Sequence, residues 1–371
     1  MPPTELIVDR AVLPDIVIAG ARVTVTDGKV VAVDASSGGA TARRLAGTLL
    51  PGLVDLQLNG AGGRSVDEAT AAALDTVAAA VFAGGAVAFL PTLITAPWPR
   101  LLEQIAAVSK WIGSWNGQGA EPLGLHVEGP FLDRAGAHDS RLFLDPTPER
   151  IDQLLAAAAG RLRLLTLSSS RPGAAAATAR LLAAGTTVAI GHVAASAGFC
   201  ECVAAGARLV THLFNAMGPL HHREPGVAGL ALDTAALSCA LIVDGAHVHP
   251  AMVRNAFAIL GPDRTVLVTD AVAAAGQPDG EYTLAGATVT LHAGVVRDAQ
   301  GHLAGSALVM AQAARNFLAT VPTAGPWTLA RIAATNPAAL VGAAAYGTLT
   351  AGKRAAFTLL GDDGSLQAAR F

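Results

Sequence analysis

The chain has 371 residues, 52% hydrophobic and 14% charged, a composition that supports a large buried core and excludes intrinsic disorder. With 25 Lys plus Arg against 28 Asp plus Glu, the net charge is −3, and no basic run indicates binding to nucleic acid or to an anionic membrane surface. Three cysteines do not suit a disulfide scaffold and favour a reducing compartment, so we expect a cytoplasmic protein with no secretory signal and no membrane span.

Short alternating segments separated by turn residues predict β-strands near the N-terminus, at 5–9, 15–19, 21–26 and 30–34. Residues 346–360 show the same pattern near the C-terminus. Two β-rich ends that enclose a long middle predict one small β-sandwich domain built from both termini. We therefore divide the chain into 1–50 and 341–371, which form this domain, and a central catalytic domain at 51–340.

The central domain repeats a short apolar run followed by an Ala- and Leu-rich helical stretch. Continuous apolar strands that alternate with helices indicate a parallel sheet buried on both faces. Eight such units predict an α/β fold, a (β/α)8 TIM-type barrel. After the eighth run, residues 280–304 alternate again and predict a β-hairpin excursion, followed by helices at 306–319 and 328–335. The eight runs are 53–58, 87–93, 123–127, 162–167, 187–190, 208–213, 240–243 and 266–269.

Polar side chains that can bind ligands end nearly every predicted barrel strand. Because active sites of such barrels lie at the carboxyl ends of the strands, these side chains are expected to meet at one mouth. Glu128, His192 and His212 form a set of two histidines and one carboxylate, which is typical of a catalytic metal site with positions left for water. A metal there lowers the pKa of water, and Asp270 is the candidate to accept its proton.

Each of these residues has a simpler explanation when it is taken alone. A single histidine at a strand end is more often a hydrogen-bonded structural residue, and Asp270 alone would cap the following helix. The joint pattern favours chemistry over these explanations. Cys200 and Cys202 are better explained as small buried hydrophobic residues than as metal ligands. Arg223 lies in a loop, where a solvated turn and an anion-binding role are equally good explanations.

Eight motifs, in order, resemble one known family. They are PGLVDLQLNG, GLHVEGPFL, GHVAAS, THLFNAM, REPGVAG, DGAHV, LVTDA and GTLTAGKRAAF. Together they resemble the N-acetylglucosamine-6-phosphate deacetylases of the amidohydrolase superfamily, from about residue 15 to about residue 360. The resemblance implies a metal-bearing barrel and an enzyme of amino-sugar catabolism that hydrolyses N-acetyl-D-glucosamine 6-phosphate to D-glucosamine 6-phosphate and acetate.

The family's functional residues fall on matching positions of this sequence. Its metal ligands fall on Glu128, His192 and His212, and its catalytic aspartate falls on Asp270. Its arginine that reaches the substrate phosphate of the neighbouring subunit falls on Arg223, which implies a homodimer. Its other substrate contacts fall on Ala137, His138, Asn215, Ala216, His247, Leu303, Ala304 and Gly305.

The sequence departs from many amidohydrolases at the end of the first barrel strand. There, Gln57 and Asn59 replace an H-x-H motif that holds a second metal, and neutral amides are poor ligands for a transition metal. A subset of the family has the same Q-x-N and works with one metal. We therefore expect one divalent transition metal per subunit, with zinc as first choice and iron, manganese and cobalt as alternatives.

The motifs leave three questions open. The substrate alternatives are N-acetylgalactosamine 6-phosphate and another N-acylated sugar phosphate, because epimers differ by the orientation of one hydroxyl. A deaminase of the same superfamily is a more distant alternative. Arg134, close to the GAHD segment, is a further candidate contact for the substrate phosphate.

Overall fold

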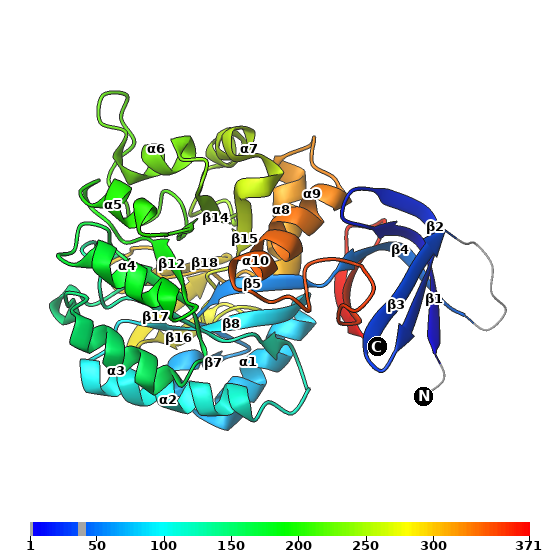
Figure 1. The fold of residues 1–371 in the computed structure, drawn as a ribbon, viewed down its shortest axis with the longest axis horizontal. Helices are drawn as coiled ribbons and strands as arrows, with labels where there is room; N and C mark the ends of the chain where they lie inside the picture. Colours follow the sequence, from blue (N-terminus) through cyan, green and yellow to red (C-terminus); the bar gives the residue numbers. More distant parts are fainter. Residues whose placement is uncertain (1–2, 36–41) are drawn as a thin grey trace.

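The computed structural model describes residues 3–35 and 42–371, and strands from both termini form a small sheet beside a larger barrel (Figure 1). The small sheet has the strand order β20-β19-β4-β1-β2-β3, with β1 parallel to β4 and antiparallel to β2. Leu6, Val23 and Phe357 lie in its core. In β2, buried residues alternate with more exposed ones, as in a sheet packed on one face. The strands are β1 Thr4–Val12, β2 Val17–Thr26, β3 Lys29–Ala35, β4 Arg43–Pro51, β19 Ala356–Leu360 and β20 Leu366–Arg370.

Eight parallel strands form a nearly closed barrel in the order β5-β8-β10-β11-β12-β13-β14-β15. All residues of β5 and β8 are buried, as expected of strands covered on both faces. The ring closes where the Asp270 amide donates to the Gln57 carbonyl at 3.0 Å and the Asn59 amide donates to the Ala271 carbonyl at 2.7 Å. The strands are β5 Leu53–Leu58, β8 Ala86–Ile94, β10 Leu125–Glu128, β11 Leu162–Leu167, β12 Thr187–Ile190, β13 Leu209–Val210, β14 Ser238–Ile242 and β15 Thr265–Val268.

Helices follow the barrel strands and cover the outside of the barrel (Figure 1). Helix α1 begins after Thr70, whose hydroxyl accepts a hydrogen bond from the Ala73 amide, and it buries Leu74 and Val77. The helices are α1 Ala71–Ala83, α2 Trp98–Gly113, α3 Pro148–Ala158, α4 Ala174–Ala183, α5 Phe199–Ala204, α6 Gly226–Asp233, α7 Pro250–Arg264, α8 Met310–Thr320, α9 Pro326–Ala330 and α10 Asn336–Leu340.

An antiparallel sheet of three strands lies between β15 and α8, where the sequence predicts a hairpin excursion. Its strands are β16 Gly280–Leu284, β17 Ala287–His292 and β18 Val295–Asp298. Val289 and Val296 pack in one cluster with Ile94, at the end of β8, and with Val272, which follows β15. This excursion therefore sits at the end of the barrel where the strands terminate.

The predicted fold class is confirmed: an α/β barrel of eight parallel strands with a small β domain from both termini. All eight predicted runs overlap barrel strands. The run at 208–213 contains the much shorter strand Leu209–Val210, because the chain leaves the extended conformation at His212, with φ of 26°. The division into 1–50, 51–340 and 341–371 stays a proposal, and residues 1–2 and 36–41 of the first part lie outside the described residues.

Candidate active site

A cavity of about 430 Å³ opens at the carboxyl ends of the barrel strands. Its lining includes the predicted metal ligands, the predicted catalytic aspartate and most of the predicted substrate contacts. Arg223 and Ala304 are the predicted site residues outside this lining, and Ala304 is buried in the core under the β16–β18 sheet. The predicted residues that line it are Glu128, Ala137, His138, His192, His212, Asn215, Ala216, His247, Asp270, Leu303 and Gly305.

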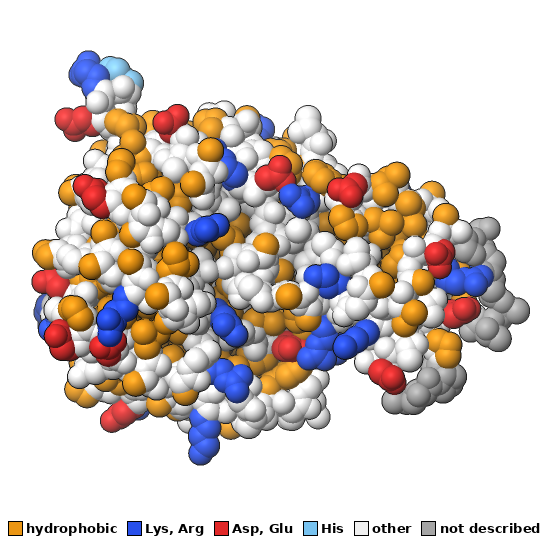
Figure 2. All heavy atoms as spheres, in the orientation of Figure 1, with side chains coloured by type: hydrophobic (Ala, Val, Ile, Leu, Met, Phe, Trp, Pro, Cys, Tyr) orange, Lys and Arg blue, Asp and Glu red, His pale blue; other side chains and the backbone are white. Residues whose placement is uncertain are grey.

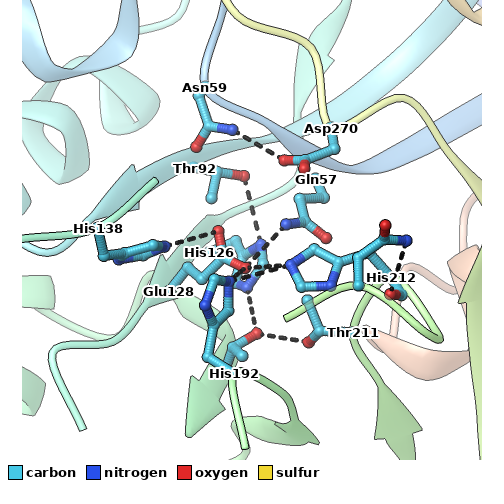
Figure 3. Close-up of polar contacts among 12 residues, drawn as sticks. Gln57, Asn59, Thr92, His126, Glu128, His138, His192, Thr211, His212 and Asp270 are labelled. Carbon is cyan, nitrogen blue, oxygen red and sulfur yellow. Dashed lines mark hydrogen bonds and ion pairs between the residues drawn. The ribbon is translucent and has the colours of Figure 1, made fainter. Parts of the chain in front are cut away.

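The side chains of Glu128, His192 and His212 converge on one point (Figure 3), and all three line the cavity. Oε1 of Glu128 lies 3.2 Å from Nε2 of His192 and 3.0 Å from Nε2 of His212, and the two Nε2 atoms are 3.1 Å apart. Glu128 ends β10, and the two histidines follow β12 and β13 with positive φ values of 50° and 26°. These unusual backbone angles accompany the turn of both imidazoles toward the same carboxylate.

The protonation of His192 suits metal binding. Its Nδ1 lies 2.8 Å from the carbonyl of Arg134, which can only accept, so Nδ1 carries a proton. The Nε2 atom of the neutral ring then presents a lone pair to the point where Glu128 and His212 converge. Nδ1 of His212 is buried and has no partner among the described residues. A carboxylate oxygen and two imidazole nitrogens at these distances therefore fit a divalent transition metal.

His138 gives a second, looser grouping, because single ligand atoms of Glu128, His138 and His192 lie within 4.8 Å of one another. Nδ1 of His138 lies 3.4 Å from the backbone N–H of Thr95, which can only donate, and 2.8 Å from the Thr95 hydroxyl. The proton of a neutral His138 ring therefore sits on Nε2, which points to Oε2 of Glu128 at 3.8 Å. A protonated ring nitrogen donates a hydrogen bond and does not bind a metal. The set of Glu128, His192 and His212 therefore fits a metal better than the set with His138.

The buried charges of the site shift one another's pKa values. Burial raises the pKa of Glu128, but its close contacts with His138, His192 and His212 outweigh burial and hold that pKa well below its usual range. Burial lowers the pKa of His138 to about 4, and the neighbouring His192 adds to the effect. Burial and the charge of Glu128 raise the pKa of Asp270 to about 6. Asp270 thus combines ionisation at neutral pH with the basicity needed to accept a proton.

The two amides that replace an H-x-H motif contact the two carboxylates of the site. Nε2 of Gln57 donates to Oε1 of Glu128 at 3.0 Å, and Nδ2 of Asn59 donates to Oδ1 of Asp270 at 3.0 Å (Figure 3). Both amides are buried. The sequence indicates only that these residues are poor metal ligands; their role as hydrogen-bond donors depends on the closure of the barrel.

His247 is oriented by Asp244, a contact that sequence reasoning missed. Nδ1 of His247 lies 2.6 Å from Oδ2 of Asp244, whose Oδ1 accepts the amides of Ala246 and His247. Burial raises the pKa of Asp244, but the bond to His247 outweighs it and lowers the pKa. The DGAH sequence carried this signal, since an Asp three residues before a His closes a turn that brings both side chains together.

His126 does not belong to the cavity, although it lies beside Glu128 in the HVEGP motif. Its ring is buried in the barrel interior between the hydroxyls of Thr92, at 3.3 Å, and Thr166, at 2.9 Å (Figure 3). The Thr166 hydroxyl in turn contacts that of Thr211 at 2.8 Å. Burial lowers the pKa of His126 to about 4, so the ring is neutral and structural.

The two arginines considered from the sequence, Arg223 and Arg134, do not line the cavity of their own chain. Arg223 lies in an exposed loop before α6, with Nη1 3.2 Å from Nε2 of His222, and this loop projects from the barrel (Figure 1). The tip of the projection carries basic, histidine and acidic side chains (Figure 2). The side chain of Arg134 is absent from the cavity lining. Arg297, on β18, is the arginine among the described lining residues, and His302 lies near it. Sequence reasoning missed both.

Known proteins are similar to this chain in sequence and in fold, although no family model matches it. The chain is 36% identical over 346 residues to the N-acetylgalactosamine-6-phosphate deacetylase of Escherichia coli O157:H7, which covers 91% of this chain and 90% of that protein. It is 34% identical over 326 residues to the N-acetylglucosamine-6-phosphate deacetylase of Vibrio furnissii, which covers 86% of this chain and 80% of that protein. The solved structure of a mutant N-acetyl-D-glucosamine-6-phosphate deacetylase from Mycobacterium smegmatis, in complex with N-acetyl-D-glucosamine-6-phosphate, matches with a TM-score of 0.93. That match has 35% identity and covers 98% of this chain and 96% of the other.

A parallel barrel with a buried carboxylate, two histidines and a second carboxylate at its strand ends defines an enzyme with a candidate metal centre. The chain belongs to the N-acetylglucosamine-6-phosphate deacetylase family of the amidohydrolase superfamily. This confirms the resemblance seen in the motifs. Among the residues that the structure describes, none of the helices has the length and apolarity needed to cross a membrane.

Proposed function

We propose that this chain hydrolyses N-acetyl-D-glucosamine 6-phosphate to D-glucosamine 6-phosphate and acetate, in the cytoplasm and as part of amino-sugar catabolism. The observation that carries the proposal is the convergence of Glu128, His192 and His212 within 3.2 Å, in one cavity with Asp270. The cavity volume of about 430 Å³ suits a small molecule such as a sugar phosphate. N-acetyl-D-galactosamine 6-phosphate is the second candidate, because the relative from Escherichia coli O157:H7 carries that name at 36% identity.

We propose that Glu128, His192 and His212 hold one divalent transition metal per subunit. A site with three protein ligands leaves positions for water and substrate. When bound, such an ion polarises a carbonyl oxygen and makes water more acidic. Zinc is the first choice, and iron, manganese and cobalt suit the same ligands.

We assign the proton transfers of the reaction to Asp270. Its carboxylate accepts the proton of the attacking water and returns it to the nitrogen of the leaving sugar. His138 presents an Nε2–H, and His247 presents the nitrogen that Asp244 does not occupy, so both are placed to contact substrate oxygens. The other proposed substrate contacts are Ala137, Asn215, Ala216, Leu303, Ala304 and Gly305.

The phosphate of the substrate needs cationic partners, because a dianion loses its hydration on entering the cavity. We propose that Arg223 supplies one of them across a homodimer. The loop of Arg223 projects from its own barrel, and that arginine is outside the cavity lining of its own chain. Both features support a contact with the site of a neighbouring subunit.

Acetate release from a panel of N-acetyl sugars and their 6-phosphates tests this function. We expect the phosphorylated N-acetylglucosamine to be the best substrate by kcat/KM. Asp270→Asn should keep the metal and lower kcat by about 10² or more, as expected on loss of general acid–base help. Preference for the galacto epimer would select the second candidate, and ammonia release without acetate would indicate a deaminase. A near-normal kcat for Asp270→Asn would assign the proton transfer to another group.

A further inference from the structure

Asn59 is a buried polar residue of the cavity that no step of the proposed reaction uses. Asn59 is 6% exposed and lines the cavity with Asp270. Its Nδ2 donates to Oδ1 of Asp270 at 3.0 Å, whereas its own Oδ1 is buried and has no partner among the described residues (Figure 3). Among the described residues, the carboxylate of Asp270 is therefore the hydrogen-bond partner of the Asn59 side-chain amide. If the amide were turned over, two oxygen atoms would face each other, so the ionised carboxylate also fixes the orientation of the amide.

The backbones of the two residues are held rigidly next to each other. The Asp270 amide donates to the Gln57 carbonyl, and the amides of Asn59 and Gly60 both donate to the carbonyl of Ala271, at 2.7 and 3.1 Å. The Asp270 carbonyl accepts the amide of Ser306 at 2.9 Å, and Asp270 has a positive φ of 50°. The backbone of Asp270 is therefore held on both sides, and only its side-chain torsions stay free to change. The hydrogen bond from the side-chain amide of Asn59 restrains those torsions.

Gln57 makes the corresponding contact on the same face of the chain. Residues two apart at a strand end point the same way, so Gln57 and Asn59 reach the mouth together. Gln57 donates to Glu128, the proposed metal ligand, and Asn59 donates to Asp270, the proposed base. The chain thus pairs each carboxylate of the site with one amide donor.

We propose that Asn59 is a positioning residue for Asp270. By engaging Oδ1, it leaves Oδ2 as the oxygen that faces water and the leaving nitrogen. An amide suits this task because it donates a hydrogen bond but does not compete for the transferred proton at neutral pH. This inference rests on the proposed role of Asp270 as the base.

The test compares Asn59→Leu, which keeps the approximate size of the side chain but lacks the donor, with the matched variant Gln57→Leu. Steady-state acetate release with N-acetyl-D-glucosamine 6-phosphate gives kcat and KM, and elemental analysis gives the metal content. For Asn59→Leu we expect kcat to fall about ten- to a hundredfold, the effect of losing a hydrogen bond to a charged group, with KM within about twofold and unchanged metal content. For Gln57→Leu we expect a loss of metal on dialysis, because its donor serves Glu128.

A double variant separates this inference from the proposed function. In the Asp270→Asn background, Asn59→Leu should cause little further loss of kcat, because the two residues act through one group. Equal losses in both backgrounds, or a wild-type kcat for Asn59→Leu alone, would overturn the positioning role while the proposed function stands. A normal kcat for Asp270→Asn would instead overturn the proposed base. If Asn59→Leu does not fold, Asn59→Ser is judged by the same comparisons.

Discussion

Asp55 provides a prediction that can be worked out from the structure. Asp55 lies on β5 and is 1% exposed. It accepts hydrogen bonds from the Thr269 hydroxyl at 2.5 Å and amide at 3.2 Å, and from the Gln57 amide at 3.3 Å. Burial raises its pKa from 3.8 to about 7, because these bonds offset only part of the cost of burying a charge and Asp270 lies nearby. The folded chain therefore holds a proton that the unfolded chain releases.

The sign of the effect on stability follows from this difference. Below pH 3.8 both states are protonated; between 3.8 and about 7 only the folded state keeps the proton, so stability falls as pH rises. Between pH 5 and pH 8, about two pH units fall in this window, because it ends at the pKa of about 7. Each of these pH units lowers the free energy of unfolding by about 1.36 kcal/mol. Wild-type protein should thus lose about 3 kcal/mol of unfolding free energy that a neutral side chain at this position keeps.

Asp55→Asn supplies that neutral side chain. The substitution retains an oxygen for the two backbone amides, and the Thr269 hydroxyl can turn toward the Gln57 carbonyl, which lies 3.4 Å away. Urea unfolding at pH 5 and pH 8 gives the difference between variant and wild type, in which the contribution of a bound metal cancels. We expect this difference to grow by about 3 kcal/mol in favour of the variant at pH 8.

The control is Asp233→Asn, because Asp233 is an exposed carboxylate at the end of α6. Its difference from wild type should stay constant between the two pH values. If the Asp55→Asn difference also stays constant, or grows on acidification, the buried carboxyl is ionised in the folded state and the reasoning is wrong.

Two further predictions concern the metal and the phosphate. Purified protein should contain about one transition-metal equivalent per chain by elemental analysis; two equivalents, reduced to one on replacement of Gln57, would contradict a mononuclear site. Arg223→Ala should lower kcat/KM for the 6-phosphate substrate about ten- to a hundredfold and leave the plain N-acetyl sugar almost unchanged. Mixing Arg223→Ala with Asp270→Asn subunits should restore activity in verified heterodimers, whereas an arginine that serves its own subunit would give no recovery. Equal losses on both sugars would remove the phosphate role, and Arg297→Gln would then be the next variant to compare.

The hydrogen bonds from the side-chain amides of Gln57 and Asn59 also bear on how the site works without an H-x-H motif. At the end of β5 this chain has side-chain amides in place of the imidazole nitrogens of an H-x-H motif. These amides donate hydrogen bonds to Glu128 and Asp270. Carboxylates held in this way keep their orientation without a second cation. The reaction that we propose can therefore use one metal and one preoriented base.

The fold followed from local pattern in the sequence. The alternation of continuous apolar runs with helical stretches sufficed to predict the barrel, since burial on both faces requires apolar residues along the whole strand. The ends of those runs also located Glu128, His192, His212 and Asp270, because every parallel strand of a barrel delivers its last residues to the same mouth.

Tertiary structure alone decided which of these residues act together and which stand apart. His126 and Glu128 are two residues apart, yet one enters the barrel interior and the other the cavity. The contact of Asn59 with Asp270 joins positions 211 residues apart and exists because the barrel closes between β5 and β15. Hydrogen-bond partners and proton positions depend on distances of a few tenths of an ångström, which a linear pattern of residue types does not contain.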